Sequence, residues 1–245
     1  MFKPRWVPLA ACFLGSGLFC LFISPGATRA DTWSNGAVTT YDQVSWTNDL
    51  TALTLLTNDY SSVYANSFSV VTVGLPNTGF TLSFDGAPPV SRFLPAGGPP
   101  AALTSSVTDP TTTPAGSFGG DVLALRLNID FSNAGFLPGT SGIPFGNLVL
   151  QNFSSQPALN GLTVSQFLGD ANTCLGGGAC IYSLGVLDTI TADLNASFTA
   201  GVVSAFAQTN LARPAVSSVP EPSSILLLMP GLFGLGLLRR RSIRA

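Results

Sequence analysis

The chain has 245 residues, a formal net charge of −2 and no histidine, and only 9% of its residues are charged. The missing histidine excludes Ser/His/Asp and Cys/His catalytic arrangements and every histidine-ligated metal site. Residues 31–218 contain three arginines, eleven aspartates and no lysine, for a net charge of −8, so this part lacks the clustered cations that bind nucleic acid and the lysine of Ser/Lys and Schiff-base chemistry.

The N-terminus has the layout of a secretory signal peptide. Two basic residues precede an apolar run over residues 7–23, and a Pro-Gly breaker follows it. Small residues at positions 28 and 30 place the predicted cleavage between Ala30 and Asp31. Residues 1–30 would then be absent from the mature protein. The alternative is an uncleaved membrane anchor.

Residues 31–84 are predicted to be rich in β-strand. Stretches 67–73 and 79–84 alternate apolar with polar residues, contain many β-branched and aromatic residues, and are separated by Gly, Pro and Asn. Two or more hairpins with one buried face are therefore expected, and residues 51–57 form either another strand or a short helix. The expected fold class is mainly β with a smaller α part, a sandwich-like secreted body of one domain or two small ones.

Residues 85–120 are rich in Pro, Gly and Thr and are predicted to be a connection, because proline removes the donors that a sheet requires. A mixed α/β part of the body then covers residues 121–211. Within it, residues 122–131 alternate apolar with polar side chains, which favours a strand, although their leucines and alanine also suit a helix. Residues 135–146 are expected to be a loop and residues 147–151 a strand.

A helix hairpin is expected in the last third of the body. Thr163 and Gln166 have the spacing of a capping box, and the apolar residues after them recur on one helix face. A second amphipathic stretch covers residues 184–198. Between them, Cys174 and Cys180 are the pair that stays once the signal peptide is removed, so a disulfide is predicted in an oxidising compartment. Two thiols without histidine do not make a metal site, and no cofactor is predicted.

The chain closes with a predicted strand over residues 202–206, an extended spacer over residues 212–218, and a tail of three parts. The first part is a short polar motif formed by Val219, Pro220, Glu221 and Pro222. The second is an uncharged segment, predicted to be a membrane helix, formed by Ile225, Leu226, Leu227, Leu228, Met229, Pro230, Gly231, Leu232, Phe233, Gly234, Leu235, Gly236, Leu237 and Leu238. The third is a basic cluster formed by Arg239, Arg240, Arg241 and Arg244.

The apolar segment is short for a membrane span. At about 1.5 Å per residue it reaches about 21 Å, against a hydrocarbon core of about 30 Å. A run of this length is also found in core helices. The arginines that follow favour a membrane segment, because clustered positive charge stops transfer and marks the cytoplasmic side.

In these three parts the chain resembles PEP-CTERM proteins, exported by Gram-negative bacteria that make exopolysaccharide matrices, whose C-terminal signal is read by the membrane protease exosortase. The resemblance covers residues 219–245. It implies an exosortase-type partner, a transient stay in the inner membrane, cleavage near Glu221 and loss of the tail. The remaining protein would then be attached to the cell surface or released into the extracellular or biofilm matrix.

Two functions of different class follow for the body. The first is a non-enzymatic surface or matrix protein that contacts polysaccharide or other copies of itself. Its aromatic residues are candidates either for stacking on sugar rings or for the core, namely Trp33, Tyr41, Trp46, Tyr60 and Tyr64.

The second function is a secreted carboxylate-dependent glycoside hydrolase or lyase, because aspartates that are distant in sequence can meet in the fold. Asp188 and Asp193 are five residues apart on an expected helix and do not face each other. Asp121 and Asp130 would lie on opposite sides of an expected strand. The sequence therefore assigns no catalytic residue.

Overall fold

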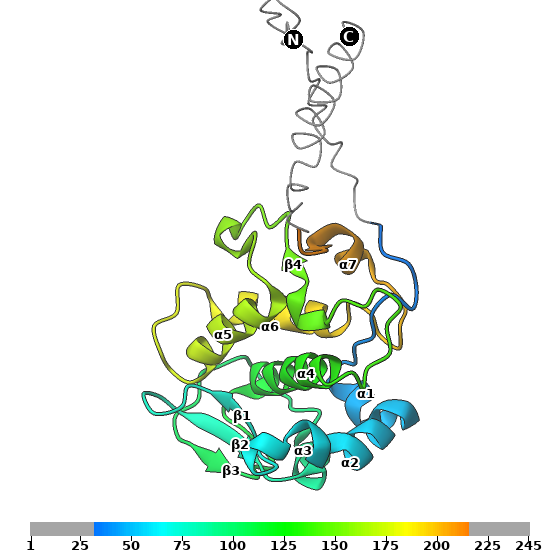
Figure 1. Cartoon of the computed structure of the whole chain (residues 1–245). Coiled ribbons are helices and arrows are strands. Elements are labelled where there is room, and N and C mark those ends of the chain that lie inside the picture. The colour runs from blue at the N-terminus through cyan, green and yellow to red at the C-terminus, as the bar shows by residue number, and fades with distance from the viewer. Residues whose placement is uncertain (1–31, 216–245) are drawn as a thin grey trace, which may run out of the picture. The chain divides into compact units, whose positions relative to one another are not determined.

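The computed structural model describes residues 32–215 and shows a mainly helical body (Figure 1). Of the described residues, 46% are helical and 9% are in strands, so the prediction of a mainly β, sandwich-like fold is wrong. In chain order the elements are α1 (Gln43–Asn48), α2 (Leu50–Val63), η1 (Ala65–Ser67), β1 (Val71–Gly74), β2 (Thr81–Phe84), α3 (Ala87–Phe93), β3 (Val107–Thr108), α4 (Gly116–Asn133), η2 (Phe145–Asn147), β4 (Val149–Leu150), η3 (Pro157–Leu159), α5 (Val164–Leu175), α6 (Leu184–Asn195), α7 (Ala205–Asn210) and β5 (Leu211–Ala212).

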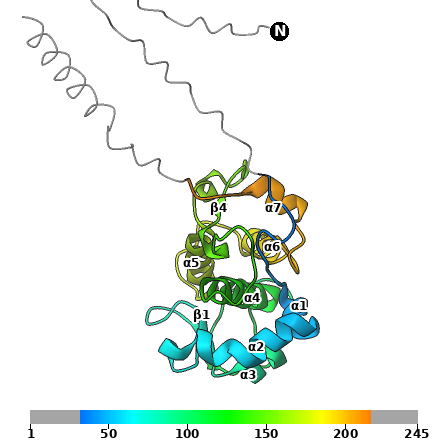
Figure 2. The ribbon, with the colours of Figure 1, turned by 45° about the vertical axis from the view of Figure 1, so that its right-hand side comes forward.

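Helix α4 lies at the centre of the body. In both views it runs between a layer formed by α1, α2, α3 and the β1–β2 hairpin and a layer formed by α5 and α6 (Figures 1 and 2). Thirteen of its 18 residues are buried. Helices α1, α5 and α6, strand β1 and the turn η2 all pack on α4.

The burial of α4 explains why the predicted strand over residues 122–131 is wrong. A helix on a protein surface shows apolar residues at a period of 3.6, but a helix covered on all sides loses that period. Much of both sets of the apparent alternation is in fact inside, since Val122, Ala124 and Asn128 are as buried as Leu123 and Leu125. With no periodic signal left, the helix propensity of leucine and alanine was the better guide.

Two aspartates explain the helices in the region that was predicted to be β-rich. The carboxylate of Asp42 accepts a hydrogen bond from the backbone N–H of Ser45 and starts α1. Asp49 caps α2 in the same way, accepting from Thr51 and Ala52. Aspartate is a favoured N-cap because its side chain satisfies N–H groups that the helix leaves unpaired. Residues 51–57, for which the sequence allowed a strand or a short helix, therefore belong to helix α2.

One β-hairpin is confirmed at the predicted stretches 67–73 and 79–84, formed by β1 and β2. β1 and β2 pair antiparallel, with Val71 opposite Phe84 and Gly74 opposite Thr81, and β3 adds to β2 in parallel. The Pro-rich stretch after the hairpin, predicted to be only a connection, contains β3, the first turn of α4 and the whole of α3. Prolines lie in the first turn of α3, where the missing N–H costs no helical hydrogen bond.

Both helices of the expected helix hairpin are present. Thr163 and Gln166 form the predicted capping box at α5, and Ser183 caps α6. The expected strand over residues 147–151 is confirmed as β4, which pairs with β5. Instead of the strand predicted over residues 202–206, α7 begins at Ala205. Among residues 32–215, no helix has the length and apolar character needed to cross a membrane.

Candidate functional sites

The predicted sorting and processing residues lie outside residues 32–215. These are the bond Ala30–Asp31, the motif Val219–Pro222, the apolar segment 225–238 and the arginines of the basic cluster. The described residues instead show where the two ends of the body lie. Both ends belong to one patch of the body, close to α7 and β5 (Figures 1 and 2).

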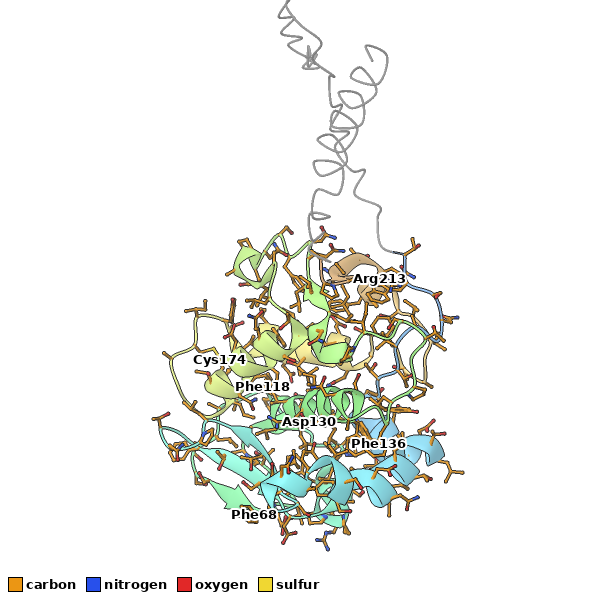
Figure 3. All side chains as sticks on the ribbon, viewed as in Figure 1. Phe68, Phe118, Asp130, Phe136, Cys174 and Arg213 are labelled. Atoms are coloured by element: carbon orange, nitrogen blue, oxygen red, sulfur yellow. A yellow bond between two sulfur atoms is a disulfide. The ribbon has the colours of Figure 1, made fainter. Side chains whose placement is uncertain are left out.

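Trp33 joins these two ends. Its indole N–H donates to the backbone oxygen of Leu211 at 2.8 Å, and the guanidinium of Arg213 lies 4.6 Å from the centre of its ring. Two further hydrogen bonds tie the backbone of Trp33 to the side chain of Gln208, at 3.0 and 2.6 Å. The first and last described segments are therefore bonded to each other, and Arg213 is labelled at this end of the body in Figure 3.

The five aromatic residues that were candidates for sugar stacking belong to the core. Each is exposed by 4% or less, namely Trp33, Tyr41, Trp46, Tyr60 and Tyr64. Several pack on one another or on α4, as in the pair Trp46 and Phe131, whose ring centres are 5.2 Å apart. The most exposed aromatic residue among residues 32–215 is instead Phe68, of which 96% is accessible. The sequence placed Phe68 in an expected strand, and nothing in its local pattern distinguished it from a core residue.

The structure also brings two aspartates together, in a pair that the sequence did not suggest. Asp121 on α4 lies beside Asp188 on α6. Burial raises the pKa of Asp121 from 3.8 to about 7, the side chain of Gln43 opposes this rise, and the carboxyl of Asp188 adds to it. Ser117 donates its hydroxyl to Asp188 at 2.8 Å. Burial thus favours the protonated form of Asp121 up to a much higher pH than for an exposed aspartate.

Two neighbouring carboxyl groups, one of them with a raised pKa, have the elements of acid–base chemistry. Their surroundings, however, are those of a packed helix contact. None of the three described cavities is lined by Asp121 or Asp188. In addition, a Cβ atom on Gly120 would lie 2.0 Å from the side-chain oxygen of Gln43, so this side of α4 is filled by protein atoms.

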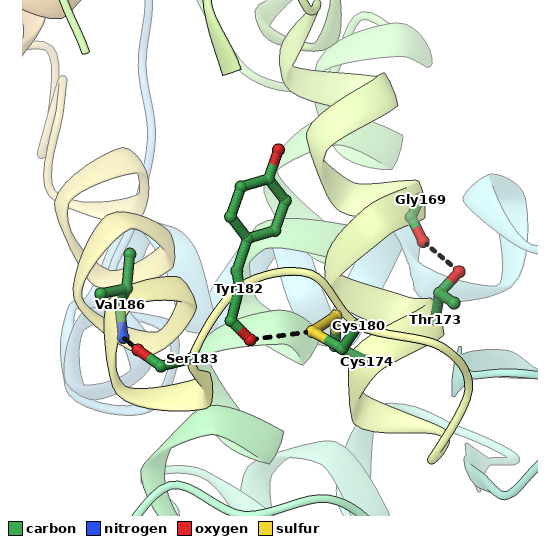
Figure 4. The surroundings of a disulfide bond; sticks show 7 residues. All are labelled: Gly169, Thr173, Cys174, Cys180, Tyr182, Ser183 and Val186. Atoms are coloured by element: carbon green, nitrogen blue, oxygen red, sulfur yellow. Dashed lines mark hydrogen bonds between the residues drawn. A yellow bond between two sulfur atoms is a disulfide. The ribbon is translucent and has the colours of Figure 1, made fainter. Parts of the chain in front are cut away.

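The predicted disulfide between Cys174 and Cys180 is confirmed, with an S–S distance of 2.01 Å. It closes the glycine-rich loop between α5 and α6, and Figure 4 shows the sulfur of Cys180 near the backbone oxygen of Tyr182. Beside it is a hollow of about 220 Å³ with Ile181 at its edge. Within residues 32–215, no group of three or more cysteines and carboxylates is placed to hold a metal ion.

Comparisons of the chain with protein-family models, with curated proteins and with solved structures found no match.

Proposed function

We propose that the chain is an exported surface or extracellular-matrix protein of a Gram-negative bacterium, with a non-enzymatic body associated with exopolysaccharide or biofilm matrix. Its last residues act as a PEP-CTERM sorting signal that an exosortase-type protease cleaves near Glu221. The proposal starts from the three-part tail and from the signal peptide that precedes residue 31. The disulfide supports it, because such bonds persist in oxidising compartments outside the cytoplasm.

The structural observation that carries the proposal is the meeting of the two ends at Trp33 and Arg213. Before processing, both apolar segments would be held in one membrane while the body faces outward. Residues 24–31 and 216–224, eight and nine residues, separate the apolar segments from the described body. A chain of that length spans at most about 32 Å. This topology therefore requires both ends to leave the body from the same side, which is how they lie.

Mass spectrometry of the mature termini tests the proposal. Wild-type protein from the surface and secreted fractions should begin at Asp31 and end near Pro220. A variant in which Pro220, Glu221 and Pro222 are all changed to Ala should keep Ala245 and stay in the membrane fraction. The matched control changes the neighbouring Ser223 and Ser224 to Ala and should be processed as the wild type is. Intact Ala245 in wild-type protein from the medium would refute the proposal.

A second candidate function, a carboxylate-dependent glycoside hydrolase or lyase, rests on the closeness of Asp121 and Asp188 alone, because none of the described hollows reaches this pair. If this activity exists, Asp121→Asn should abolish release of reducing sugar from an exopolysaccharide preparation. Asp193→Asn, on the same helix as Asp188 but outside the pair, is the matched control. Equal release by wild type and by Asp121→Asn would exclude catalysis by this pair.

A further inference from the structure

The largest described hollow, of about 530 Å³, lies where η1, β1, α4 and α5 meet. This volume falls within the range of small-molecule sites in proteins, which is about 300–1,000 Å³. Most of its lining side chains are polar or aromatic, which distinguishes it from a gap between core residues. The lining residues are Ser67, Phe68, Val70, Thr72, Gly74, Pro76, Arg126 and Asn172.

Phe68 stands in an unusual backbone conformation at the rim of the hollow. Its φ is 55° and that of Ser69 is 59°, a region that is rare for a bulky residue. Hydrogen bonds from Ser69 to the backbone oxygen of Tyr64 and from Val70 to that of Ser67 hold the turn in place. The turn thus keeps a large apolar ring in solvent at a cost in strain, which in proteins is concentrated at functional sites. Figure 3 shows Phe68 at the periphery of the body.

The charged residue that lines the hollow is Arg126, which belongs to the central helix α4. Its Nε donates to the carboxylate of Asp130, one helical turn further on, and 38% of its side chain stays exposed. Because that hydrogen bond uses Nε, the terminal nitrogens of the guanidinium keep their N–H donors for a ligand. Also lining the hollow is Asn172 on α5. Its side-chain oxygen accepts from the backbone N–H of Gly74 at 2.7 Å, which leaves its NH₂ group for a ligand as well.

We propose that this hollow binds an uncharged carbohydrate, with the ring of Phe68 stacked on one face of a sugar and Arg126 and Asn172 hydrogen-bonded to its hydroxyls. Aromatic rings supply apolar area at a low entropic cost, and a few placed polar groups give orientation. This sugar site deepens the proposed matrix association. The source of the sugar rests on that proposed function, whereas the binding chemistry follows from the residues of the hollow.

The charge balance of the hollow favours a neutral ligand over an acidic one. The positive charge of Arg126 is balanced by Asp130, and residues 31–218 have a net charge of −8. An anionic ligand would therefore meet a pair that is already neutralised, within a field that repels it. The donors of Arg126 and Asn172 and the hydroxyl of Ser67, which line the same hollow, instead match the hydroxyl groups of a sugar.

The test is calorimetric titration of the full chain, kept in solution with a detergent that has no sugar headgroup. The neutral probes are tetrasaccharides of glucose, mannose and galactose, and the acidic probe is a tetragalacturonate. At least one neutral probe should bind, and Phe68→Ala should weaken that binding tenfold or more. Phe68→Trp should retain the binding because it keeps a stacking ring. Ile181→Ala, at another exposed apolar residue (82% accessible), should bind as the wild type does.

The variants are expected to fold because Phe68 is almost fully exposed, and the thermal unfolding midpoint of Phe68→Ala checks this. Ser67→Ala, which removes one hydroxyl from the same hollow, should weaken binding several-fold. Absence of binding by every neutral probe would overturn the proposal, as would tighter binding of the acidic probe or full binding by Phe68→Ala. Correct mature termini without sugar binding would reject this inference alone. Sugar binding with an unprocessed tail would reject the proposed export route alone.

Discussion

The side-chain amide of Asn128 donates a hydrogen bond to the side-chain oxygen of Asn195, 3.0 Å away, inside the contact between α4 and α6. Asn128 also exchanges two hydrogen bonds with the backbone of Tyr41, and Asn195 donates to the backbone oxygen of Asp121. Both asparagines are fully buried. This network aligns the segment before α1, the central helix and α6, because buried polar groups need their partners.

Replacing Asn128 with Leu should therefore destabilise the protein by about 3 kcal/mol, since it removes the hydrogen-bond partners of the Tyr41 backbone and of the side-chain oxygen of Asn195. Urea unfolding followed by circular dichroism measures the change. The matched control is Asn133→Leu at the exposed end of the same helix, which should stay within about 0.5 kcal/mol of wild type. Equal effects of the two substitutions would contradict the role given to the network.

The contact between Asp121 and Asp188 predicts a pH dependence of stability. The pKa of Asp121 is about 7 in the folded protein against 3.8 for a solvent-exposed aspartate, so the folded state binds the proton more tightly than the unfolded state. The unfolding free energy should thus fall as pH rises from about 4 to about 7, and change no further from this group above that range. The loss amounts to a few kcal/mol, at about 1.4 kcal/mol per pKa unit.

Asp121→Asn should remove this pH dependence and be more stable than wild type at pH 8. Urea midpoints of both proteins at pH 5 and pH 8 measure it. Asp59→Asn, on α2 and away from the α4–α6 contact, should follow the wild-type pH profile. Parallel profiles for wild type and Asp121→Asn would show that Asp121 does not titrate in this range.

Removal of the disulfide should lower stability only moderately. Cys174 and Cys180 are six positions apart, and closing so short a loop restrains the unfolded chain by about 2 kcal/mol. The double variant with serine at both positions should therefore fold and unfold at a lower urea concentration. Its urea midpoint should lie below that of oxidised wild type and should equal that of wild type whose disulfide has been reduced. A difference that persists after reduction would indicate that the serines themselves disturb the packing.

Trp33 should be the residue on which the joining of the two ends depends. It is 4% exposed and packs edge-on against Phe198, with ring centres 5.4 Å apart. Trp33→Ala should cost about 4 kcal/mol through the cavity it leaves. Trp33→Phe should cost about 1 kcal/mol, mainly for the lost hydrogen bond to Leu211. Leu50→Ala, at a residue 79% exposed, is the control and should change little in thermal unfolding.

Features that depend on neighbours in the chain could be predicted from the sequence. The capping box needs Thr163 and Gln166 only three residues apart, and the pairing of Cys174 with Cys180 needs a short loop. The hairpin around Thr81 was recognisable for the same reason, because its two strands and its turn are adjacent. The two N-caps at Asp42 and Asp49 carried an equally local signal, which the β-like composition of the region outweighed.

The sequence by itself determined the local signals and the excluded chemistry, because a missing histidine or a helix cap does not depend on distant parts of the chain. Only the tertiary structure decided that α4 is covered over most of its surface, that Asp121 meets Asp188, and that Tyr64 is buried while Phe68 is exposed. Each of these depends on contacts between residues far apart in sequence. Burial on every side erases the periodicity from which a sequence is interpreted, and proximity between distant residues leaves no local pattern.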